Sequence, residues 1–313
     1  KSKKMISEKK IKNEKCIICG NNNFIYLFSD PDKYVHSTNK RFSIYKCLNC
    51  DLISIDPKIN ESEFDLYYPE KYIPYSSEYK KISFFQLYFK KTKNLFSNIF
   101  KIDKIKAELD YFKDLEKKYL DFGCGSGRHL NHIKDQYPKW ELYGHDKSQH
   151  VKNNFKDKNI NFIDDLESMP DDFFDFINLT SVIEHLIYPS ETIYLLRRKL
   201  KKDGMIIIKT PNWNSLGRVL FRNNWVHYDI PRHIYVFSSK NLKKFLNNRN
   251  FIIVRTLYSN NFSVELKSIY RSLKFSRRPK IHNILAKFFL PLGILLNITA
   301  LSSTVTIIGK KND

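Results

Sequence analysis

The sequence predicts an α/β fold: a doubly wound, mostly parallel, seven-stranded sheet, preceded by a small zinc ribbon and a helical linker. From Lys118 onward, apolar strand-like runs alternate with helix-like segments, which favours a parallel sheet with helices on both faces. A glycine turn at Gly123–Gly127 interrupts this alternation directly after an apolar run. Two C-x2-C pairs stand near the amino terminus, ahead of the alternating region. These three observations together predict the fold class.

The elements of the sheet are expected in a fixed order along the chain. Strands are predicted at 118–122, 140–145, 160–163, 174–180, 205–210, 251–258 and 303–309, and helices at 126–136, 148–157, 190–200 and 239–248. The turn Lys202-Asp-Gly204 is expected to precede the buried strand that begins at Met205. The last strand follows a long insertion, 261–301, which is first basic and then apolar.

The charge of the chain leaves two interpretations open. With 313 residues the chain can bury a large core, and its net charge of +21 suits an anionic partner such as nucleic acid, a phosphorylated substrate or an anionic membrane. Lys greatly outnumbers Arg, however, and Asn and Ile are abundant throughout. The basic residues are therefore equally compatible with a solvated surface that carries no dedicated binding face.

Two segments bear on localisation. The amino terminus, Lys1–Met5, is basic, but no apolar segment of a secretory signal follows it, so we expect a cytoplasmic protein. The apolar segment 288–296 contains Pro291 and is too short to span a bilayer. We expect it to pack against the domain, and contact of 284–301 with a membrane surface is the alternative.

Four cysteines have the spacing of a structural metal site. Cys16 and Cys19 form one C-x2-C pair, Cys47 and Cys50 form the other, and strand-like segments lie between the pairs. Each pair can present two thiolates from a tight turn, and four thiolates complete a closed tetrahedral zinc site with no open position for catalysis. Two disulfides are the alternative, but they require an oxidising compartment. The fifth, Cys124, is interpreted as a small packing residue within the glycine turn.

The glycine turn and two acidic residues predict a nucleoside site. Gly123, Gly125 and Gly127 allow backbone torsions and close approaches that a Cβ would block, and the helix that follows offers free N–H groups. Asp121 ends the strand before the turn. Asp146 ends the next strand, where a carboxylate can bind ribose hydroxyls.

The stretch from about 117 to 257 resembles the class I S-adenosylmethionine-dependent methyltransferases in four consecutive blocks. The blocks are Leu120–Gly127, Gly144–Ser148, Phe162–Pro170, and a last one that begins at Phe173-Phe-Asp175, continues through Val182-Ile-Glu-His185 and Leu200–Gly204, and ends at Thr210-Pro-Asn212. The resemblance implies a Rossmann-like fold and S-adenosylmethionine as cofactor. It further implies that Asp165 faces the adenine amino group and that the backbone N–H of Leu166 faces the ring. His145 and Asp164 depart from the usual pattern of the family.

The resemblance also suggests how the chain divides. We expect a zinc-ribbon module at 1–72, a helical linker or cap at 73–116, and a methyltransferase domain at 117–313 with a substrate loop at 211–237. The zinc ribbon and the segment Trp225–Ser238 together are similar to bacterial methyltransferases of sugar and surface-polysaccharide synthesis. This narrower resemblance implies a nucleotide-linked or lipid-linked sugar as acceptor, and no nucleic-acid partner.

Three histidines are expected where the fold places the acceptor, at the carboxyl ends of the fourth and fifth strands. His227, with Tyr228 beside it, is our first candidate for the general base, because histidine accepts protons near neutral pH. His185 is a second candidate, with packing beside the cofactor as its alternative. Arg232 and His233 are candidates for binding a substrate phosphate, and they can equally hold the shape of the loop.

Two other functions compete with this prediction. An RNA methyltransferase would explain the positive charge, but the ribbon contains few basic residues between positions 20 and 50. A protein that keeps the fold as a scaffold without catalysis would not need the complete cofactor motif. The sequence leaves open the identity of the acceptor, the atom that is methylated and the oligomeric state.

Overall fold

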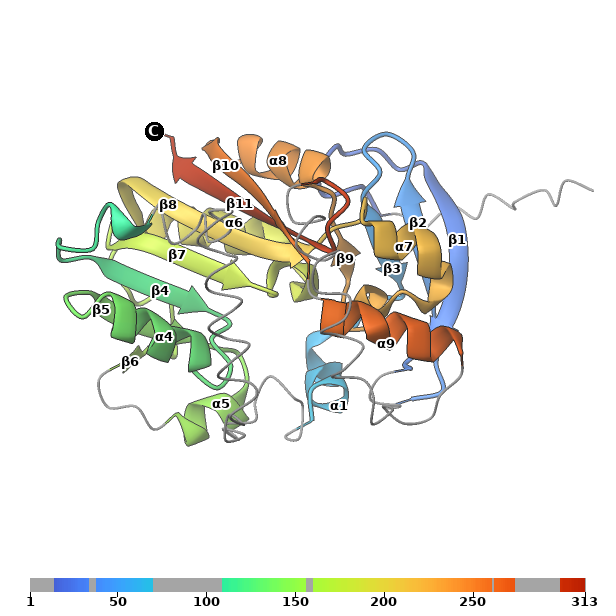
Figure 1. Ribbon diagram of the computed structural model, residues 1–313, viewed down its shortest axis with the longest axis horizontal. Coiled ribbons are helices and arrows are strands. Elements are labelled where there is room, and N and C mark those ends of the chain that lie inside the picture. The colour runs from blue at the N-terminus through green and yellow to red at the C-terminus, as the bar shows by residue number, and fades with distance from the viewer. Residues whose placement is uncertain are drawn as a thin grey trace, which may run out of the picture.

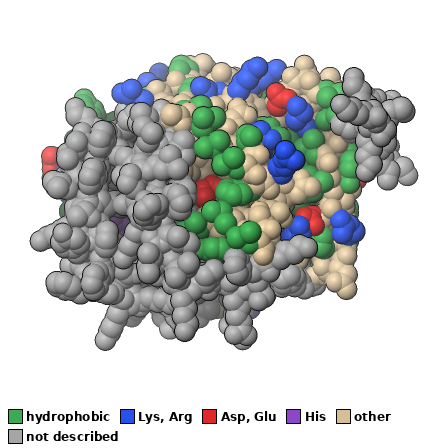
Figure 2. All heavy atoms as spheres, turned by 45° about the vertical axis from the view of Figure 1, so that its right-hand side comes forward, with side chains coloured by type: hydrophobic (Ala, Val, Ile, Leu, Met, Phe, Trp, Pro, Cys, Tyr) green, Lys and Arg blue, Asp and Glu red, His purple; other side chains and the backbone are tan. Residues whose placement is uncertain are grey.

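The computed structural model describes residues 14–33, 38–69, 109–155, 160–260, 262–273 and 299–312. Most of the expected linker 73–116 and the apolar segment within 284–301 lie outside these ranges. Among the described residues, no helix is both long and apolar enough to cross a membrane. Lys and Arg side chains on the face in Figure 2 are dispersed among apolar and acidic ones.

A seven-stranded, mostly parallel sheet forms the centre of the molecule, in the order β10-β11-β8-β7-β4-β5-β6 (Figure 1). Strands β4 to β8 pair in parallel, whereas β11 is antiparallel to both β8 and β10. The strands are β4 (Lys118–Phe122), β5 (Glu141–His145), β6 (Asn161–Phe162), β7 (Phe174–Thr180), β8 (Leu200–Pro211), β10 (Phe251–Ser259) and β11 (Thr304–Lys311). The predicted fold class is confirmed.

Helices cover the sheet where the sequence predicts them. They are α4 (Arg128–Gln136), α5 (Gln149–Asn154), α6 (Pro189–Lys199) and α8 (Ser239–Asn247). Helix α8 shows why its sequence folds locally: Ser238 Oγ accepts from the Asn241 N–H, and Asn241 Oδ1 accepts from the Ser238 N–H, which forms a capping box. Its apolar face, with Leu242, Phe245 and Leu246, is buried.

One boundary differs from the prediction. Strand β8 begins at Leu200 and not at Met205, because Leu200 is fully buried and pairs with Phe174 of β7. The predicted turn at Lys202-Asp-Gly204 falls inside this longer strand, and Asp203 adopts a φ of 63° there. Burial of Leu200 therefore extends the strand through a turn-like sequence.

The cysteine-rich segment forms a second sheet, of four antiparallel strands in the order β1-β2-β3-β9. These are β1 (Phe24–Pro31), β2 (Arg41–Cys47), β3 (Ile53–Asp56) and β9 (Tyr235–Val236). Strand β9 belongs to the predicted substrate loop 211–237, so this loop completes the sheet of the amino-terminal module. One hydrophobic core continues from this sheet into the large one.

Seven further helices connect or flank the strands of the two sheets, and Figure 1 labels three of them, α1, α7 and α9. They are η1 (Glu61–Glu63), α1 (Phe64–Tyr67), η3 (Ile183–His185), α7 (Leu216–Phe221), η4 (Arg222–Asn224), η5 (Val226–Tyr228) and α9 (Phe262–Ser272). Helix α9 lies within the predicted insertion 261–301. It fixes η5, because Ser268 Oγ accepts a hydrogen bond of 2.9 Å from the Val226 N–H.

Candidate active site

A cavity of about 1100 Å³ opens at the carboxyl ends of β4, β5, β7 and β8. The glycine turn and Asp146 line one side, and Glu184, His185 and His233 line another. Residues of the amino-terminal module also line the cavity, among them Phe64 and Tyr68. Drug-sized ligands occupy pockets of about 300–1000 Å³. The cavity therefore has room for a nucleoside cofactor and a second small molecule.

The glycine turn is a backbone cradle that a side chain would fill. Gly123 adopts a φ of 76°, and a Cβ on it would lie 2.5 Å from Val182 Cγ2. Gly127 adopts a φ of 71°, and a Cβ there would lie 2.9 Å from the ring of Phe155. Both positions require the left-handed conformation as well as the space, so glycine is needed for two reasons.

Asp146 is held at the end of β5 by the glycine turn itself. Its Oδ2 accepts a hydrogen bond of 2.9 Å from the Gly125 N–H, and its Oδ1 accepts one of 2.9 Å from the Ser148 N–H. Burial raises the pKa of this carboxyl, although the two N–H donors lower it in part. Each oxygen keeps a second lone pair, with which it can accept a hydrogen bond from a ribose hydroxyl.

Asp121 is the second acid of the cofactor side. It is buried, lines the cavity, and its Oδ1 accepts a hydrogen bond of 2.7 Å from Asn178 Nδ2 on the neighbouring strand β7. Burial raises the pKa of its carboxyl. Cys124 is also buried, and burial raises the pKa of its thiol, which agrees with packing and not with a nucleophile.

Two adjacent acids follow β6, and both are exposed. Asp164 lines the cavity and pairs with Lys152 at 2.6 Å. The Oδ1 of Asp165 accepts a hydrogen bond of 2.9 Å from the Glu167 N–H. The side chain of Leu166 is buried in the core. The Asx turn at Asp165 uses one oxygen of the carboxylate that the resemblance assigned to adenine, and Asp164 is the acid of the two that lines the cavity.

These residues fit S-adenosylmethionine. The cradle that admits no Cβ allows close approach of a ligand, and the buried carboxylate of Asp146 has lone pairs for hydroxyl donors. When bound, this cofactor supplies a methyl group on a positively charged sulfonium. The chain's own residues then have to orient the acceptor and remove its proton.

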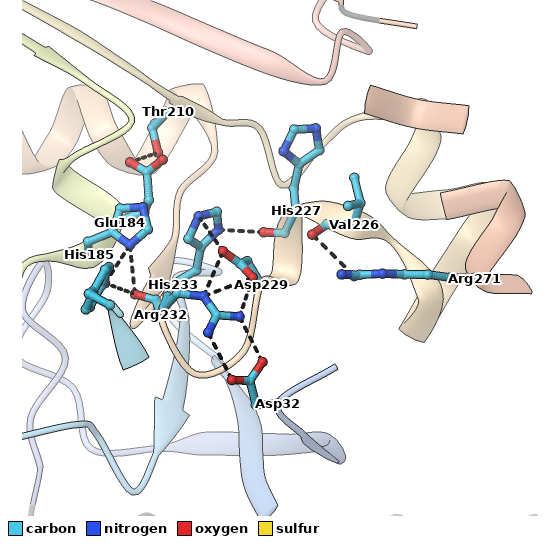
Figure 3. A network of polar contacts seen from close by, with 11 residues as sticks. Asp32, Glu184, His185, Thr210, Val226, His227, Asp229, Arg232, His233 and Arg271 are labelled. Carbon is cyan, nitrogen blue, oxygen red and sulfur yellow. Dashed lines mark hydrogen bonds and ion pairs between the residues drawn. The ribbon is translucent and has the colours of Figure 1, made fainter. Parts of the chain in front are cut away.

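Glu184, His185 and His233 form a polar cluster on the acceptor side (Figure 3). Burial, together with the nearby His233, lowers the pKa of His185 to about 3. Burial also lowers the pKa of His233 to about 4 and raises the pKa of Glu184 to about 7. Both imidazoles are therefore neutral at neutral pH, and His185 is a weaker base than the prediction required.

Arg232 is a buried anchor of the loop that carries His233. Its Nη atoms donate hydrogen bonds of 3.0 and 2.9 Å to the carboxylate of Asp32 in the amino-terminal module. Its Nη2 also donates one of 2.7 Å to Asp229 (Figure 3). The guanidinium is fully buried. Of the two predicted roles for Arg232, the geometry supports the role in holding the loop, because a buried and paired guanidinium does not reach a substrate phosphate.

The structure separates the two remaining catalytic candidates. His227 lines the large cavity, and its Nε2 lies 3.5 Å from Glu265 Oε1 of α9. Tyr228 lines a different and very small pocket, where its ring packs edge-on against Phe28 and Trp225. The prediction of Tyr228 as a partner in catalysis is therefore corrected: consecutive residues of the short 3₁₀ helix η5 face different directions.

The four predicted metal ligands come together at the end of the small sheet. The Sγ atoms of Cys16 and Cys50 lie 3.4 Å apart, and those of Cys19 and Cys47 lie 3.6 Å apart. All four fall within 4.8 Å of one another. Zinc–sulfur bonds of about 2.3 Å hold tetrahedral thiolates roughly 3.8 Å apart, so this donor set fits a zinc ion.

Sequence reasoning missed three residues of the site. Glu184 was recognised only as part of a motif, although its position beside His185 could have indicated a role. Tyr68, whose hydroxyl lies 2.9 Å from His185 Nδ1, and Glu265, which lies beside His227, come from distant parts of the chain. No local pattern in the sequence identifies either of these two.

Residues 93–256 match a family described as a methyltransferase domain. Because the match covers more than half of the chain, the chain belongs to this family. Its fold and its glycine-turn site are those of a class I S-adenosylmethionine-dependent methyltransferase.

Known proteins resemble the chain more distantly. A SAM-dependent methyltransferase of Archaeoglobus fulgidus is 23% identical, with a TM-score of 0.45 over 70% of this chain and 99% of that one. One of Thermotoga maritima is 18% identical, with a TM-score of 0.44 over 72% of this chain and 98% of that one. A 37.1 kDa protein in a transposon of Streptomyces fradiae, described as uncharacterized, is 27% identical over 106 residues, which are 31% of each chain.

Proposed function

We propose that the chain transfers a methyl group from S-adenosylmethionine to a small acceptor, a nucleotide-linked or lipid-linked sugar of surface-polysaccharide synthesis. The observation that carries the small acceptor is the shared cavity. Glu184, His185, His227 and His233 line the same space as the glycine turn, and its volume of about 1100 Å³ suits two small molecules. The similarity of the ribbon and of the loop 225–238 to sugar methyltransferases supports the sugar.

The residues of the cavity perform two tasks in this proposal. They align the acceptor atom with the methyl carbon, an effect worth up to about 7–11 kcal/mol. His227 takes the proton that the acceptor loses as its bond to the methyl carbon forms and the carbon–sulfur bond breaks. Glu265, whose Oε1 lies 3.5 Å from His227 Nε2, stabilises the imidazolium that results.

A turnover assay tests the acceptor. Purified protein is incubated with S-adenosylmethionine and, separately, with nucleotide sugars and with short RNAs, and formation of S-adenosylhomocysteine is followed. Turnover of a nucleotide sugar supports the proposal. Turnover of RNA alone, with RNA binding that weakens steeply with salt, would establish the alternative of an RNA methyltransferase. Failure to bind S-adenosylhomocysteine in calorimetry would favour the scaffold.

Substitution of His227 tests the base. His227→Ala should lower the turnover rate by about 10²-fold or more and leave S-adenosylhomocysteine affinity unchanged, since a general base contributes about 10²–10⁴-fold. The matched control is His132→Ala, on the exposed side of α4, which should turn over normally. Normal turnover by His227→Ala would assign the base elsewhere.

The amino-terminal module completes the proposal with a structural zinc ion held by Cys16, Cys19, Cys47 and Cys50. Its support is the Sγ separations of 3.4 and 3.6 Å across the two pairs. Metal analysis of freshly purified protein should find zinc, and Cys47→Ala should remove it. Protein that contains no zinc as purified would exclude this site.

A further inference from the structure

The buried acid Glu184 has an unsatisfied oxygen that requires an explanation. Its side chain is 1% exposed, and Oε2 accepts a hydrogen bond of 2.9 Å from Thr210 Oγ1. Oε1 is buried and has no hydrogen-bond partner among the described residues. A buried carboxylate oxygen without a partner costs about 1–3 kcal/mol or more. Glu184 therefore calls for a positive charge or a donor that the described part of the chain does not supply.

The two histidines beside Glu184 each have one ring nitrogen fixed by a backbone carbonyl. Nδ1 of His185 lies 3.1 Å from the Arg232 carbonyl oxygen, and Nδ1 of His233 lies 2.7 Å from that of His227. A carbonyl only accepts hydrogen bonds, so Nδ1 of His233 carries the proton and its Nε2 keeps a lone pair. Nδ1 of His185 also lies 2.9 Å from the Tyr68 hydroxyl, which can accept from it as the carbonyl does. A histidine that binds a metal through Nε2 usually donates its Nδ1 proton to a partner of this kind.

The three side chains are close enough to share one ion. One ligand atom each from Glu184, His185 and His233 can be chosen so that all three lie within 4.8 Å of one another. Metal–nitrogen and metal–oxygen bonds measure about 2.0–2.2 Å, so the three ligand atoms have to move closer together around an ion. Another carboxylate oxygen, Asp229 Oδ2, lies 4.0 Å from His233 Nε2. Asp229 is engaged with Arg232.

We propose that Glu184, His185 and His233 bind a divalent first-row transition-metal ion whose open coordination positions face the acceptor. Two imidazoles and one carboxylate suit Zn²⁺, Mn²⁺, Fe²⁺ or Co²⁺, whereas Mg²⁺ and Ca²⁺ prefer oxygen ligands alone. Three protein ligands leave positions free, which is typical of catalytic and not of structural ions.

The position of the proposed ion in the cavity indicates what it does in the reaction. Glu184, His185 and His233 line the cavity that also holds the glycine turn, so the ion lies on the acceptor side of the cofactor site. A hydroxyl that occupies an open position of such an ion loses its proton more readily than a free hydroxyl. The proposed ion thus fixes the acceptor hydroxyl and assists His227.

Titration with Mn²⁺ tests the site, because thiolates select zinc and the four-cysteine site does not retain Mn²⁺. The full chain is prepared with one zinc ion per chain by metal analysis, so that only the four-cysteine site is occupied. It is then titrated with Mn²⁺, and the free ion is followed by its electron paramagnetic resonance signal. The wild type should bind one Mn²⁺ per chain. Glu184→Gln keeps the shape of the side chain, and His233→Asn keeps an N–H donor in place of Nδ1. Each should weaken Mn²⁺ binding at least about tenfold.

A matched control and a folding readout accompany the titration. Glu141→Gln, at an exposed position on β5, should bind Mn²⁺ as the wild type does. Calorimetry with S-adenosylhomocysteine shows whether each variant keeps its cofactor site, and His233→Asn is the test if Glu184→Gln does not fold. If the wild type binds neither Mn²⁺ nor Co²⁺, or if all variants bind equally, the metal site is overturned, and a proton or a water satisfies Glu184.

This proposal extends the proposed function but is tested independently of it. Specific Mn²⁺ binding without turnover of any nucleotide sugar would keep the metal site and remove the sugar acceptor. Turnover of a nucleotide sugar by protein that binds no Mn²⁺ or Co²⁺ would keep the acceptor and remove the metal site.

Discussion

The two sides of the cavity are built in different ways. On the cofactor side, one short stretch, 121–127, supplies the backbone turn, and Asp146 is held by the N–H groups of Gly125 and Ser148. On the acceptor side, His185 lies after β7, His233 lies in the loop before β9, and both depend on contacts with the amino-terminal module. The cofactor side is local in sequence, and the acceptor side is assembled from three distant segments.

This difference indicates which part of the site depends on the cysteine-rich module. Asp32 of that module holds Arg232, and the Arg232 carbonyl in turn orients His185. The hydroxyl of Tyr68, also in that module, contacts Nδ1 of His185. We therefore regard the module as part of the acceptor site and not as an appended domain, while the glycine turn needs none of its contacts.

The largest expected effect is on the acceptor side, from Arg232→Met. Removal of the guanidinium leaves Asp32 and Asp229 as buried carboxylates without their partner, which typically costs about 3–5 kcal/mol. Urea unfolding should show this loss of stability. The control is Arg198→Met, an exposed residue whose partner Asp171 stays solvated, and it should be much less destabilising. Equal stability of the two variants would contradict the anchoring role.

The second effect is confined to the cofactor side. Gly123→Ala adds a Cβ 2.5 Å from Val182 Cγ2 and forces alanine into the left-handed region, which costs roughly 1–2 kcal/mol from the torsion alone. Affinity for S-adenosylhomocysteine should fall about tenfold or more in calorimetry. Gly20→Ala carries the same torsional strain, with a φ of 69°, but has open space around it and lies away from the cavity. It should bind normally.

A third effect distinguishes the two neighbouring acids after β6. Asp164 lines the cavity and Asp165 does not, so Asp164→Asn should lower S-adenosylhomocysteine affinity more than Asp165→Asn does. We expect about a threefold to tenfold loss, the worth of one hydrogen bond. The same calorimetric titration measures both variants. A larger loss from Asp165→Asn would support the assignment that the family resemblance implied.

The smallest expected effect is on the pH dependence of stability. Burial by itself would raise the pKa of Asp229, but Arg232 outweighs burial and lowers that pKa below its usual value. The stabilisation is therefore present above the unfolded pKa of about 3.9 and is lost as the pH falls through the folded value. Urea unfolding should show that the free energy of unfolding decreases less between pH 5 and pH 3 in Asp229→Asn than in the wild type. If the decrease is the same in both proteins, Asp229 does not contribute to the pH dependence.

Local pattern was sufficient for most of the sheet and for the cofactor turn. Alternating apolar runs located each of the seven strands, and the glycine spacing located the turn, because backbone torsions and strand burial are encoded over a few residues. The start of β8 at Leu200 was missed, since pairing with Phe174 overrode a turn-like sequence. The position of Asp164 in the cavity wall was not predicted, because the Asx turn that holds Asp165 cannot be read from the motif. The assignment of Asp165 to adenine stays a prediction.

The sequence by itself determined the family, the cofactor turn and the four clustered cysteines, because each depends on residues that are near neighbours or on a fixed spacing. Only the tertiary structure decided the acceptor side. In the structure, Arg232 is a buried residue that holds its loop and does not bind a phosphate, and Tyr228 lies outside the large cavity. Glu184 lies beside His185 and His233. These outcomes depend on which distant charges and rings are buried together, and no local pattern specifies that.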